Sequence, residues 1–353
     1  MLGGQIVFLS GANQAWVSYA SDFGNQNYKR TKGSLERYLR ELHEAGGNSI
    51  RIWIHAGGEV TPHFDEHGYV IGLDRDGTFL NEIKDYLEKA KEYNIMVFFC
   101  LWNGALVHPR LDGLINDPQK LQSYIDNALI PWVEAVKDYP SLGGWDILNE
   151  PEGMIVPNLP HHEPCFDTRS LYLSGAGWTR HYHTAQELQR FINWQADAIH
   201  RADPKSLVTI GTWNPRSATD RMCMTDFYKD TCLLKAGQRS NGTLDFYQIH
   251  SYDDNNKYDA YSPFKLRACD YGHYKPIVVG EFNQVRGGGM DITAQFLHVY
   301  KNKYNGAWSW HAGATGTNSD TWRNQRRGIS ALANVAELHN HARINISYVP
   351  AVS

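Results

Sequence analysis

The sequence of 353 residues lacks a membrane-length apolar run, because no window approaches the about 18 to 20 uninterrupted apolar residues that span a bilayer. It also lacks a basic excess: 34 Lys and Arg stand against 38 Asp and Glu, a formal net charge of −4. We therefore expect no membrane and no nucleic acid as a partner. No glycine-rich phosphate loop follows the first predicted strand, which disfavours a nucleotide-dependent enzyme.

Cysteine is scarce, and its odd count of 5 leaves at least one thiol unpaired. Cys100 lies in the apolar run IMVFFCL and is predicted to be a small buried residue. The remaining cysteines have polar surroundings that suit two disulfides, with the pairing left open: Cys165, Cys223, Cys232 and Cys269. Disulfides favour an oxidising compartment, so we expect a secreted protein. The N-terminal segment MLGGQIVFLSGANQ is too short and polar for a signal peptide, which is expected to be absent from this sequence.

A metal-ligand motif is missing as well. The cysteines form no Cys-x-x-Cys pair, and four histidines lack the spacing of a helical or turn-borne ligand set: His161, His162, His181 and His183. We expect no metal and no cofactor. These histidines belong to a long insert, at about 153–183, that is predicted to be a solvated loop covering the site.

Aromatic residues, by contrast, are abundant: 11 Trp, 20 Tyr and 13 Phe make up 12% of the chain. The default place for such residues is the core. Several tryptophans nevertheless lie in polar, glycine-containing segments, where a flat amphipathic ring can stack on the face of a sugar. This pattern favours a carbohydrate ligand.

The chain contains no linker rich in Pro, Gly and Ser and no short repeat, which predicts one domain over 1–353. Eight apolar runs are predicted strands: 6–10, 49–54, 95–102, 144–150, 207–213, 246–252, 277–282 and 307–310. Helical patterns lie between and after them, at 34–46, 79–93, 121–139, 184–202, near 225–236, near 263–271, 292–304 and 325–342. Eight strands with interleaved helices imply parallel pairing and a closed (β/α)8 TIM barrel of the α/β class.

Two carboxylates are the main candidates for catalysis. Functional residues of such barrels lie at the C-terminal ends of the strands, where Glu150 closes DILNEP and Glu281 closes IVVGEF. The fourth and seventh strands face each other across the barrel, so the two side chains are expected to enter one cleft from opposite sides. Glycoside hydrolysis needs such a pair, because one carboxyl group protonates the leaving oxygen while the other attacks or activates water.

The motifs WDILNEPEG, IHSYD, VVGEF and AWSW, in this order over nearly the whole chain, resemble glycoside hydrolase family 5 of clan A, a family of retaining (β/α)8-barrel endoglycanases. The resemblance implies that Glu150 is the acid/base and Glu281 the nucleophile. WDILNEPEG with LWNGA and GAWSW is most similar to animal-type endo-β-1,4-mannanases. This implies hydrolysis of mannan, glucomannan or galactomannan.

Further residues are assigned to substrate binding: Arg51, Asn149, His250, Tyr252, Trp310, Trp102, Asn103 and Trp213. Arg51 and Tyr252 are expected to keep Glu281 ionised and oriented. We expect Asn149 to donate to the sugar 2-hydroxyl.

The other assignments follow from position on the strands. His250 is expected to bond to the substrate or the acid/base, and Trp310 to form a platform under the sugar at the cleavage point. The segment LWNGALVH after the third strand lacks the histidine that many family members carry there, which leaves the roles of Trp102 and Asn103 open.

Two alternatives remain for the whole chain. One is an endo-β-1,4-glucanase (cellulase) of the same clan, because mannose and glucose differ only at the 2-hydroxyl. The other is a catalytically inactive barrel that binds polysaccharide. The presence of both Glu150 and Glu281 argues against this alternative. In either case we expect a monomer.

Overall fold

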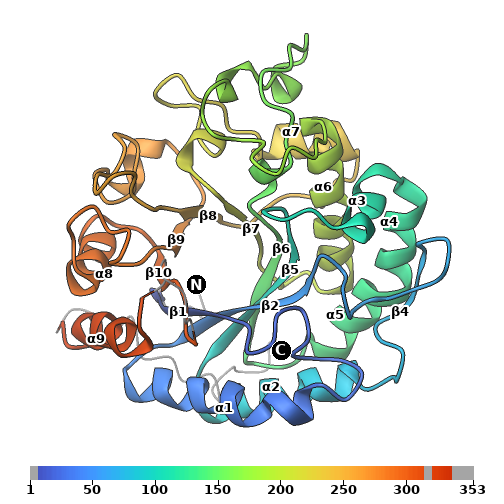
Figure 1. Cartoon of the computed structure of the whole chain (residues 1–353), viewed down its shortest axis with the longest axis horizontal. Helices are drawn as coiled ribbons and strands as arrows, with labels where there is room; N and C mark the ends of the chain where they lie inside the picture. The colour runs from blue at the N-terminus through green and yellow to red at the C-terminus, as the bar shows by residue number, and fades with distance from the viewer. Residues whose placement is uncertain (1–6, 314–319, 336–353) are drawn as a thin grey trace.

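The computed structural model describes residues 7–313 and 320–335. Eight parallel strands form a closed barrel in the order β1-β10-β9-β8-β7-β6-β5-β2 (Figure 1). Their bounds are β1 Leu9–Ala15, β2 Ser49–Ala56, β5 Met96–Asn103, β6 Leu142–Asn149, β7 Val208–Thr212, β8 Tyr247–His250, β9 Ile277–Glu281 and β10 Gly306–Ser309. Each corresponds to one predicted apolar run, so the predicted (β/α)8 barrel is confirmed.

Helices surround the barrel (Figure 1). They are α1 Tyr28–Glu44, α2 Phe79–Glu92, α3 Pro109–Asn116, α4 Pro118–Tyr124, α5 Ile130–Val136, α6 Ala185–Ala202, α7 Asp230–Gly237, α8 Ile292–Lys301 and α9 Trp322–Ala333. Their apolar faces cover the strands, as in α1, where Leu35, Leu39 and Leu42 are fully buried. In the described part of the chain, no helix has the length and apolar character needed to cross a membrane.

Several predicted boundaries were wrong. The first strand runs over Leu9–Ala15 rather than 6–10, which adds Asn13 to the strand itself. The predicted helix at 121–139 is divided by a π-helical turn, Ile125–Leu129, next to Pro131, which has no N–H to donate to a regular helix. The pattern near 263–271 gives only the short turn Ala268–Tyr271. A small hairpin of β3 His63–Phe64 and β4 Val70–Gly72 was not predicted.

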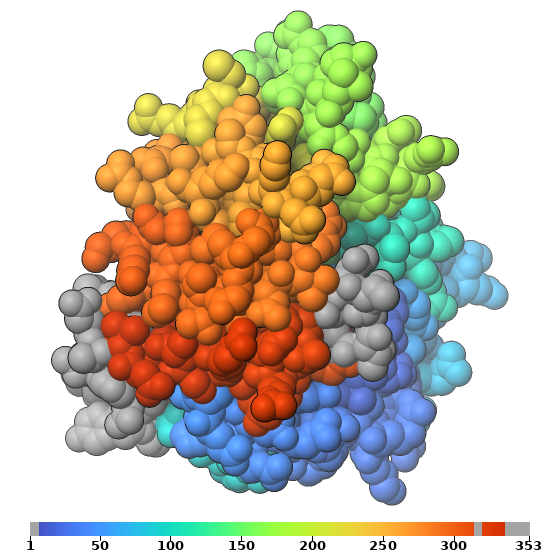
Figure 2. Space-filling view, turned by 60° about the vertical axis from the view of Figure 1, so that its left-hand side comes forward, coloured from blue at the N-terminus to red at the C-terminus, as the bar shows by residue number. Residues whose placement is uncertain are grey.

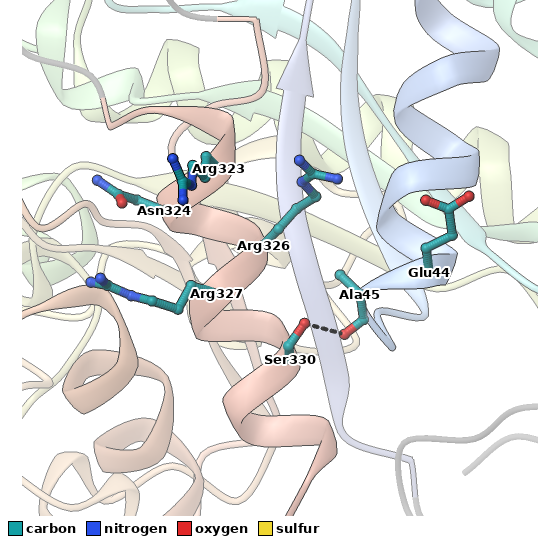
Figure 3. A pocket seen from close by; sticks show the side chains of 7 residues that line it. All are labelled: Glu44, Ala45, Arg323, Asn324, Arg326, Arg327 and Ser330. Carbon is teal, nitrogen blue, oxygen red and sulfur yellow. Dashed lines mark hydrogen bonds between the residues drawn. The ribbon is translucent and has the colours of Figure 1, made fainter.

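The first and last described helices lie side by side, which Figure 2 shows as blue next to red. Trp322 Nε1 of α9 donates to Glu41 Oε2 of α1 at 2.6 Å, and Ser330 Oγ donates to Ala45 O at 3.1 Å. Between them is a hollow of about 550 Å³, lined by three arginines with Glu44 and Ala45 (Figure 3). Predicted helix residues after position 335 lie outside the described residues.

The barrel interior is layered. Its lower layer is apolar and consists of Met96, Phe98, Phe246, Val278 and Trp308. Trp308 is fully buried there, and its Nε1 donates to Ser49 Oγ at 2.9 Å. Polar and charged side chains form the layer above, towards the C-terminal ends of the strands. The apolar layer therefore lies beneath the candidate active site.

The cysteines form one disulfide in the described residues, so the prediction of two was wrong. Cys165 in the insert is bonded to Cys232 in α7. Cys223 and Cys269 are exposed free thiols, and Cys100 is a buried free thiol as predicted. The polar residues around these cysteines indicate that they lie in loops, but they do not show which two cysteines meet in space.

Candidate active site

The two predicted carboxylates meet at the C-terminal end of the barrel. Glu281 is the last residue of β9, and Glu150 directly follows β6. Glu150 has φ +46° and ψ +58°, an uncommon conformation for a non-glycine residue, and its N–H donates to Gly211 O at 2.6 Å. One carboxylate oxygen of each residue and one ring nitrogen of His250 lie within 4.8 Å of one another.

Arg51 organises the layer beneath this pair. Its Nη1 donates to Glu281 Oε1 at 2.7 Å, and its Nε donates to Asp146 Oδ2 at 2.7 Å. Its Nη2 donates to Asn149 Oδ1 at 2.9 Å. Because the Arg51 side chain is 0% exposed, its assignment to substrate binding was wrong. Its bond to Glu281 is the contact that was expected from the sequence, and it fixes groups that can touch the substrate.

Two side chains from the β8 region complete the surroundings of the pair. The hydroxyl of Tyr252, two residues after the end of β8, donates to Glu281 Oε2 at 2.9 Å. His250 is buried, with Nδ1 2.9 Å from Glu150 Oε1 and 3.5 Å from Glu281 Oε2. His250 therefore contacts the predicted acid/base, which was one of its two expected partners.

These partners differentiate the two carboxyl groups. Burial raises the pKa of Glu150 to about 7, and Arg51 opposes this rise. Burial also raises the pKa of Glu281, but Arg51 and the Tyr252 hydroxyl oppose it. Burial lowers the pKa of His250 itself to about 4, so its ring is neutral near pH 7. Glu150 is thus the member of the pair that more readily carries the proton.

Asn149 and Asn103 form a second small network. Asn149 Nδ2 donates to Asn103 Oδ1 at 3.1 Å, and Asn103 Nδ2 donates to the Tyr19 hydroxyl at 3.1 Å. An amide nitrogen carries two protons, so Asn149 retains one for a ligand. Asn103 is only 3% exposed, and its oxygen also accepts from Ala105 N at 3.1 Å. Asn103 thus holds the Asn149 side chain in place, and its own assignment to a substrate subsite stays a prediction.

The predicted tryptophans have different positions. Trp310 is half-buried and contacts the rings of Trp16 and Trp53, with centroids 5.9 and 5.6 Å away. Trp213 is also half-buried, 6.0 Å from the ring of Trp178 in the insert. Trp102 was predicted wrongly: it is 0% exposed, and its Nε1 donates to Gln195 of α6 at 3.0 Å. Its side chain packs between the barrel wall and the helices.

Two residues of the site, Trp53 and Tyr19, were not assigned from the sequence. Trp53 lies two positions after Arg51 on β2, so strand alternation could have identified it. Tyr19 lies in a loop, and no pattern in the sequence pointed to it. Glu152, which follows Pro151, is fully buried and accepts from Ser217 Oγ at 2.6 Å and Tyr228 Oη at 2.7 Å. Burial raises the pKa of Glu152 to about 7, although these hydrogen bonds oppose the rise.

A cleft of about 320 Å³ adjoins the pair through Tyr252. Its lining comes from the insert and from the loops after β7, β8 and β9: Ser174, Trp213, Asn214, Arg216, Tyr252, Asp253, Asp254, Asp259 and Arg286. The insert thus reaches the rim of the site, although its central segment projects at the upper edge of Figure 1. The larger hollow of Figure 3 has only one acidic side chain, Glu44, and contains neither catalytic candidate.

Gly211 on β7 allows the polar layer to pack. A methyl group at this position would lie 2.7 Å from His250 Nε2 and 3.0 Å from Arg51 Nη2. We expect Gly211→Ala to displace both side chains and to lower kcat by roughly tenfold to a hundredfold, because misplaced catalytic groups are costly. Steady-state kinetics would measure this loss.

Gly33→Ala is the matched control for this substitution. A methyl group on the exposed Gly33 of α1 would meet no atom within 4 Å. It should leave kcat unchanged and raise stability by about 0.5–1 kcal/mol, as alanine usually does in a helix interior. Wild-type kcat in Gly211→Ala would contradict the positioning role of this layer.

The closed barrel and the carboxylates at its strand ends define a (β/α)8 glycoside hydrolase. No family model matches the chain. The mannan endo-1,4-β-mannosidase of Mytilus edulis is 49% identical over 333 residues, which cover 93% of this chain and 89% of that protein. The chain therefore belongs to the mannan endo-1,4-β-mannosidase family.

Solved structures agree with this relationship. The β-1,4-mannanase from the common sea hare Aplysia kurodai is 50% identical, with a TM-score of 0.93 over 98% of this chain and 97% of that chain. The endo-1,4-β-mannanase from Eisenia fetida is 43% identical, with a TM-score of 0.95 over 98% and 97% of the two chains.

Proposed function

We propose that this chain is a retaining endo-β-1,4-mannanase of glycoside hydrolase family 5, clan A, that cleaves internal bonds of mannan, glucomannan or galactomannan. The observation that carries the proposal is the pair of carboxylates, with oxygens of Glu150 and Glu281 within 4.8 Å, in a member of the mannosidase family. Retaining glycosidases hold their carboxyl groups about 5–5.5 Å apart, whereas inverting enzymes need about 6.5–9.5 Å to admit a water. The short separation supports direct attack by one carboxylate.

In the first step, Glu281 attacks the anomeric carbon while Glu150 gives its proton to the departing oxygen. The glycosidic C–O bond breaks, and a C–O bond to Glu281 forms. Arg51 and Tyr252 hold the attacking carboxylate in place through the bonds at 2.7 and 2.9 Å. The raised pKa of Glu150, about 7, keeps its proton available for the leaving group.

In the second step, Glu150 removes a proton from water, and the water oxygen attacks the same carbon. Glu281 leaves as a carboxylate, which regenerates the starting state. The ester of the intermediate carries no charge, so the repulsion that Glu281 exerts on an ionised Glu150 is absent at this stage. One pair of carboxyl groups thus serves both steps without a cofactor.

Substrate contacts are assigned to Asn149, Trp310 and Trp213. The remaining amide proton of Asn149 can reach a sugar hydroxyl, and discrimination between mannose and glucose would depend on the groups around it. Trp213 lines the cleft of about 320 Å³ and would hold a neighbouring sugar. We further propose that the enzyme acts as a secreted monomer, for which the disulfide between Cys165 and Cys232 supports an oxidising compartment.

Trp310→Ala is expected to lower kcat/KM on mannohexaose by roughly tenfold to a hundredfold, because a sugar at the cleavage point loses its aromatic platform. Trp310→Phe should retain most of the activity. Steady-state kinetics on both variants measures this. Equal losses in the two variants would show that Trp310 only supports the packing of Trp16 and Trp53.

Two measurements test the proposed function itself. Initial rates on galactomannan should far exceed those on soluble cellulose, and the reverse order would favour a cellulase. Proton NMR of the first products of mannohexaose should show the β-anomer first. An α-anomer appearing first would exclude retention, and no hydrolysis of either polymer would favour a binding protein.

A further inference from the structure

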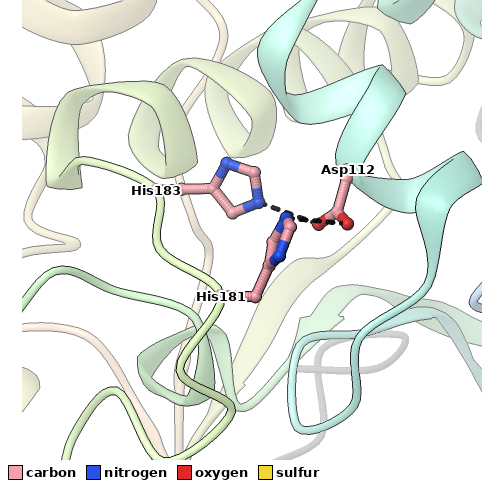
Figure 4. A group of neighbouring side chains, drawn as sticks. All are labelled: Asp112, His181 and His183. Atoms are coloured by element: carbon pink, nitrogen blue, oxygen red, sulfur yellow. Dashed lines mark hydrogen bonds and ion pairs between the residues drawn. The ribbon is translucent and has the colours of Figure 1, made fainter.

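Asp112, His181 and His183 form a compact cluster outside the catalytic pair (Figure 4). Asp112 lies in α3, whereas both histidines lie at the end of the insert, just before α6. Figure 4 shows the three side chains converging from these two segments. His181 Nε2 lies 2.9 Å from Asp112 Oδ2, and His183 Nε2 lies 3.0 Å from Asp112 Oδ1. One possible ligand atom from each residue lies within 4.8 Å of the others.

The hydrogen bond of His183 Nδ1 indicates which ring nitrogen of His183 is free to bind a cation. His183 Nδ1 is 3.0 Å from the amide oxygen of Asn116, which can only accept a hydrogen bond. Nδ1 must therefore carry the proton. In the neutral ring, Nε2 then directs its lone pair at the Asp112 carboxylate, an arrangement that a cation between them would stabilise. Metal-binding histidines commonly donate their other N–H to such an oxygen.

We propose that Asp112, His181 and His183 form a zinc site. Two imidazole nitrogens and a carboxylate are a favourable set of ligands for Zn²⁺. Zinc bonds of about 2.0–2.2 Å in tetrahedral geometry separate two ligands by roughly 3.3 Å. The observed separations of 2.9 and 3.0 Å are close to this value, and each joins one histidine to a different oxygen of Asp112. His181 is 47% exposed at its side chain, so a water can take the fourth position.

Bound zinc would fasten the insert to α3. His183 N donates to Met154 O at 2.7 Å, and Val156 N donates to His183 O at 2.9 Å. The site is thus joined by the backbone to the start of the insert, four residues after Glu150. The expected role is structural: the metal holds the insert at the rim of the cleft and takes no part in the chemical steps. The spacing in sequence gave no hint of this site, because Asp112 and His183 are 71 residues apart.

Equilibrium dialysis of the chelator-treated full chain against Zn²⁺, followed by metal analysis, tests the proposal. We expect one zinc per chain and a rise in Tm of a few degrees at a zinc concentration about a hundredfold above Kd. His181→Ala should abolish both effects, and Asp112→Asn should weaken binding at least tenfold. His162→Ala is the matched control, because this exposed histidine of the same insert lies outside the cluster.

Other results would overturn the proposal. Absence of bound zinc in the wild type would show that His181 and His183 simply pair with Asp112. Glu150, His250 and Glu281 also bring ligand atoms within 4.8 Å of one another and offer a competing site. Zinc that is retained by His181→Ala and lost from Glu281→Gln would assign the metal there. Neither result depends on the proposed mannanase activity.

Discussion

Glu281→Gln is expected to lower kcat on mannan by at least about 10⁴-fold, because an amide cannot form the covalent intermediate. The amide oxygen can still accept from Arg51 Nη1, and Tyr252 can reverse its hydrogen bond to accept from the amide nitrogen. The fold should therefore survive the substitution. Initial rates on galactomannan, together with Tm, measure the two effects separately.

Small anions distinguish the roles of the two carboxylates. In Glu281→Ala, azide can occupy the space of the lost carboxylate and attack the anomeric carbon, giving an α-mannosyl azide from a substrate with an activated leaving group. In Glu150→Ala, azide should instead attack the glycosyl-enzyme and give the β-product. Wild-type activity in Glu281→Gln, or a β-azide from Glu281→Ala, would show that Glu281 is not the nucleophile.

The barrel and the meeting of Glu150 with Glu281 could be predicted because they depend on local patterns. Each strand is a short apolar run, and in a parallel barrel all strand ends of one kind face the same side. An acidic residue that closes such a run, as Glu150 and Glu281 do, must then lie at that end. The meeting of the two residues follows from strand order and needs no knowledge of side-chain packing.

The errors arose where the depth of a side chain matters. Arg51 and Trp102 lie on strands with polar ends, but the sequence does not show that each is fully buried by segments distant in the chain. For Trp102 the deciding partner is Gln195, 93 residues away. The disulfide between Cys165 and Cys232 likewise depends on how the insert packs on α7. Such contacts between loops and helices leave no periodic pattern of residues in the sequence from which they could be predicted.

The second large effect is expected for Glu150→Ala on natural substrates. Loss of a general acid should lower kcat/KM on mannan by about 10²–10⁴-fold, because the sugar leaving group needs a proton. An aryl mannobioside with a highly acidic phenol needs none, so its kcat/KM should fall much less. Stopped-flow measurement of phenol release compares the two classes of substrate. Equal losses on both would mean that Glu150 does not act as the acid.

The pH profile gives an independent test of the same residue. The acid must be protonated, and the pKa of Glu150 is raised to about 7 by burial, so wild-type kcat/KM on mannan should fall about tenfold per pH unit above 7. With the activated substrate, this alkaline limb should disappear in Glu150→Ala. Glu152→Gln is the matched control, because burial raises the pKa of Glu152 to about 7 as well. Since Glu152 bonds to Ser217 and Tyr228, away from the pair, its variant should keep the limb. If the alkaline limb vanished in Glu152→Gln, the titrating group would be Glu152 and not Glu150.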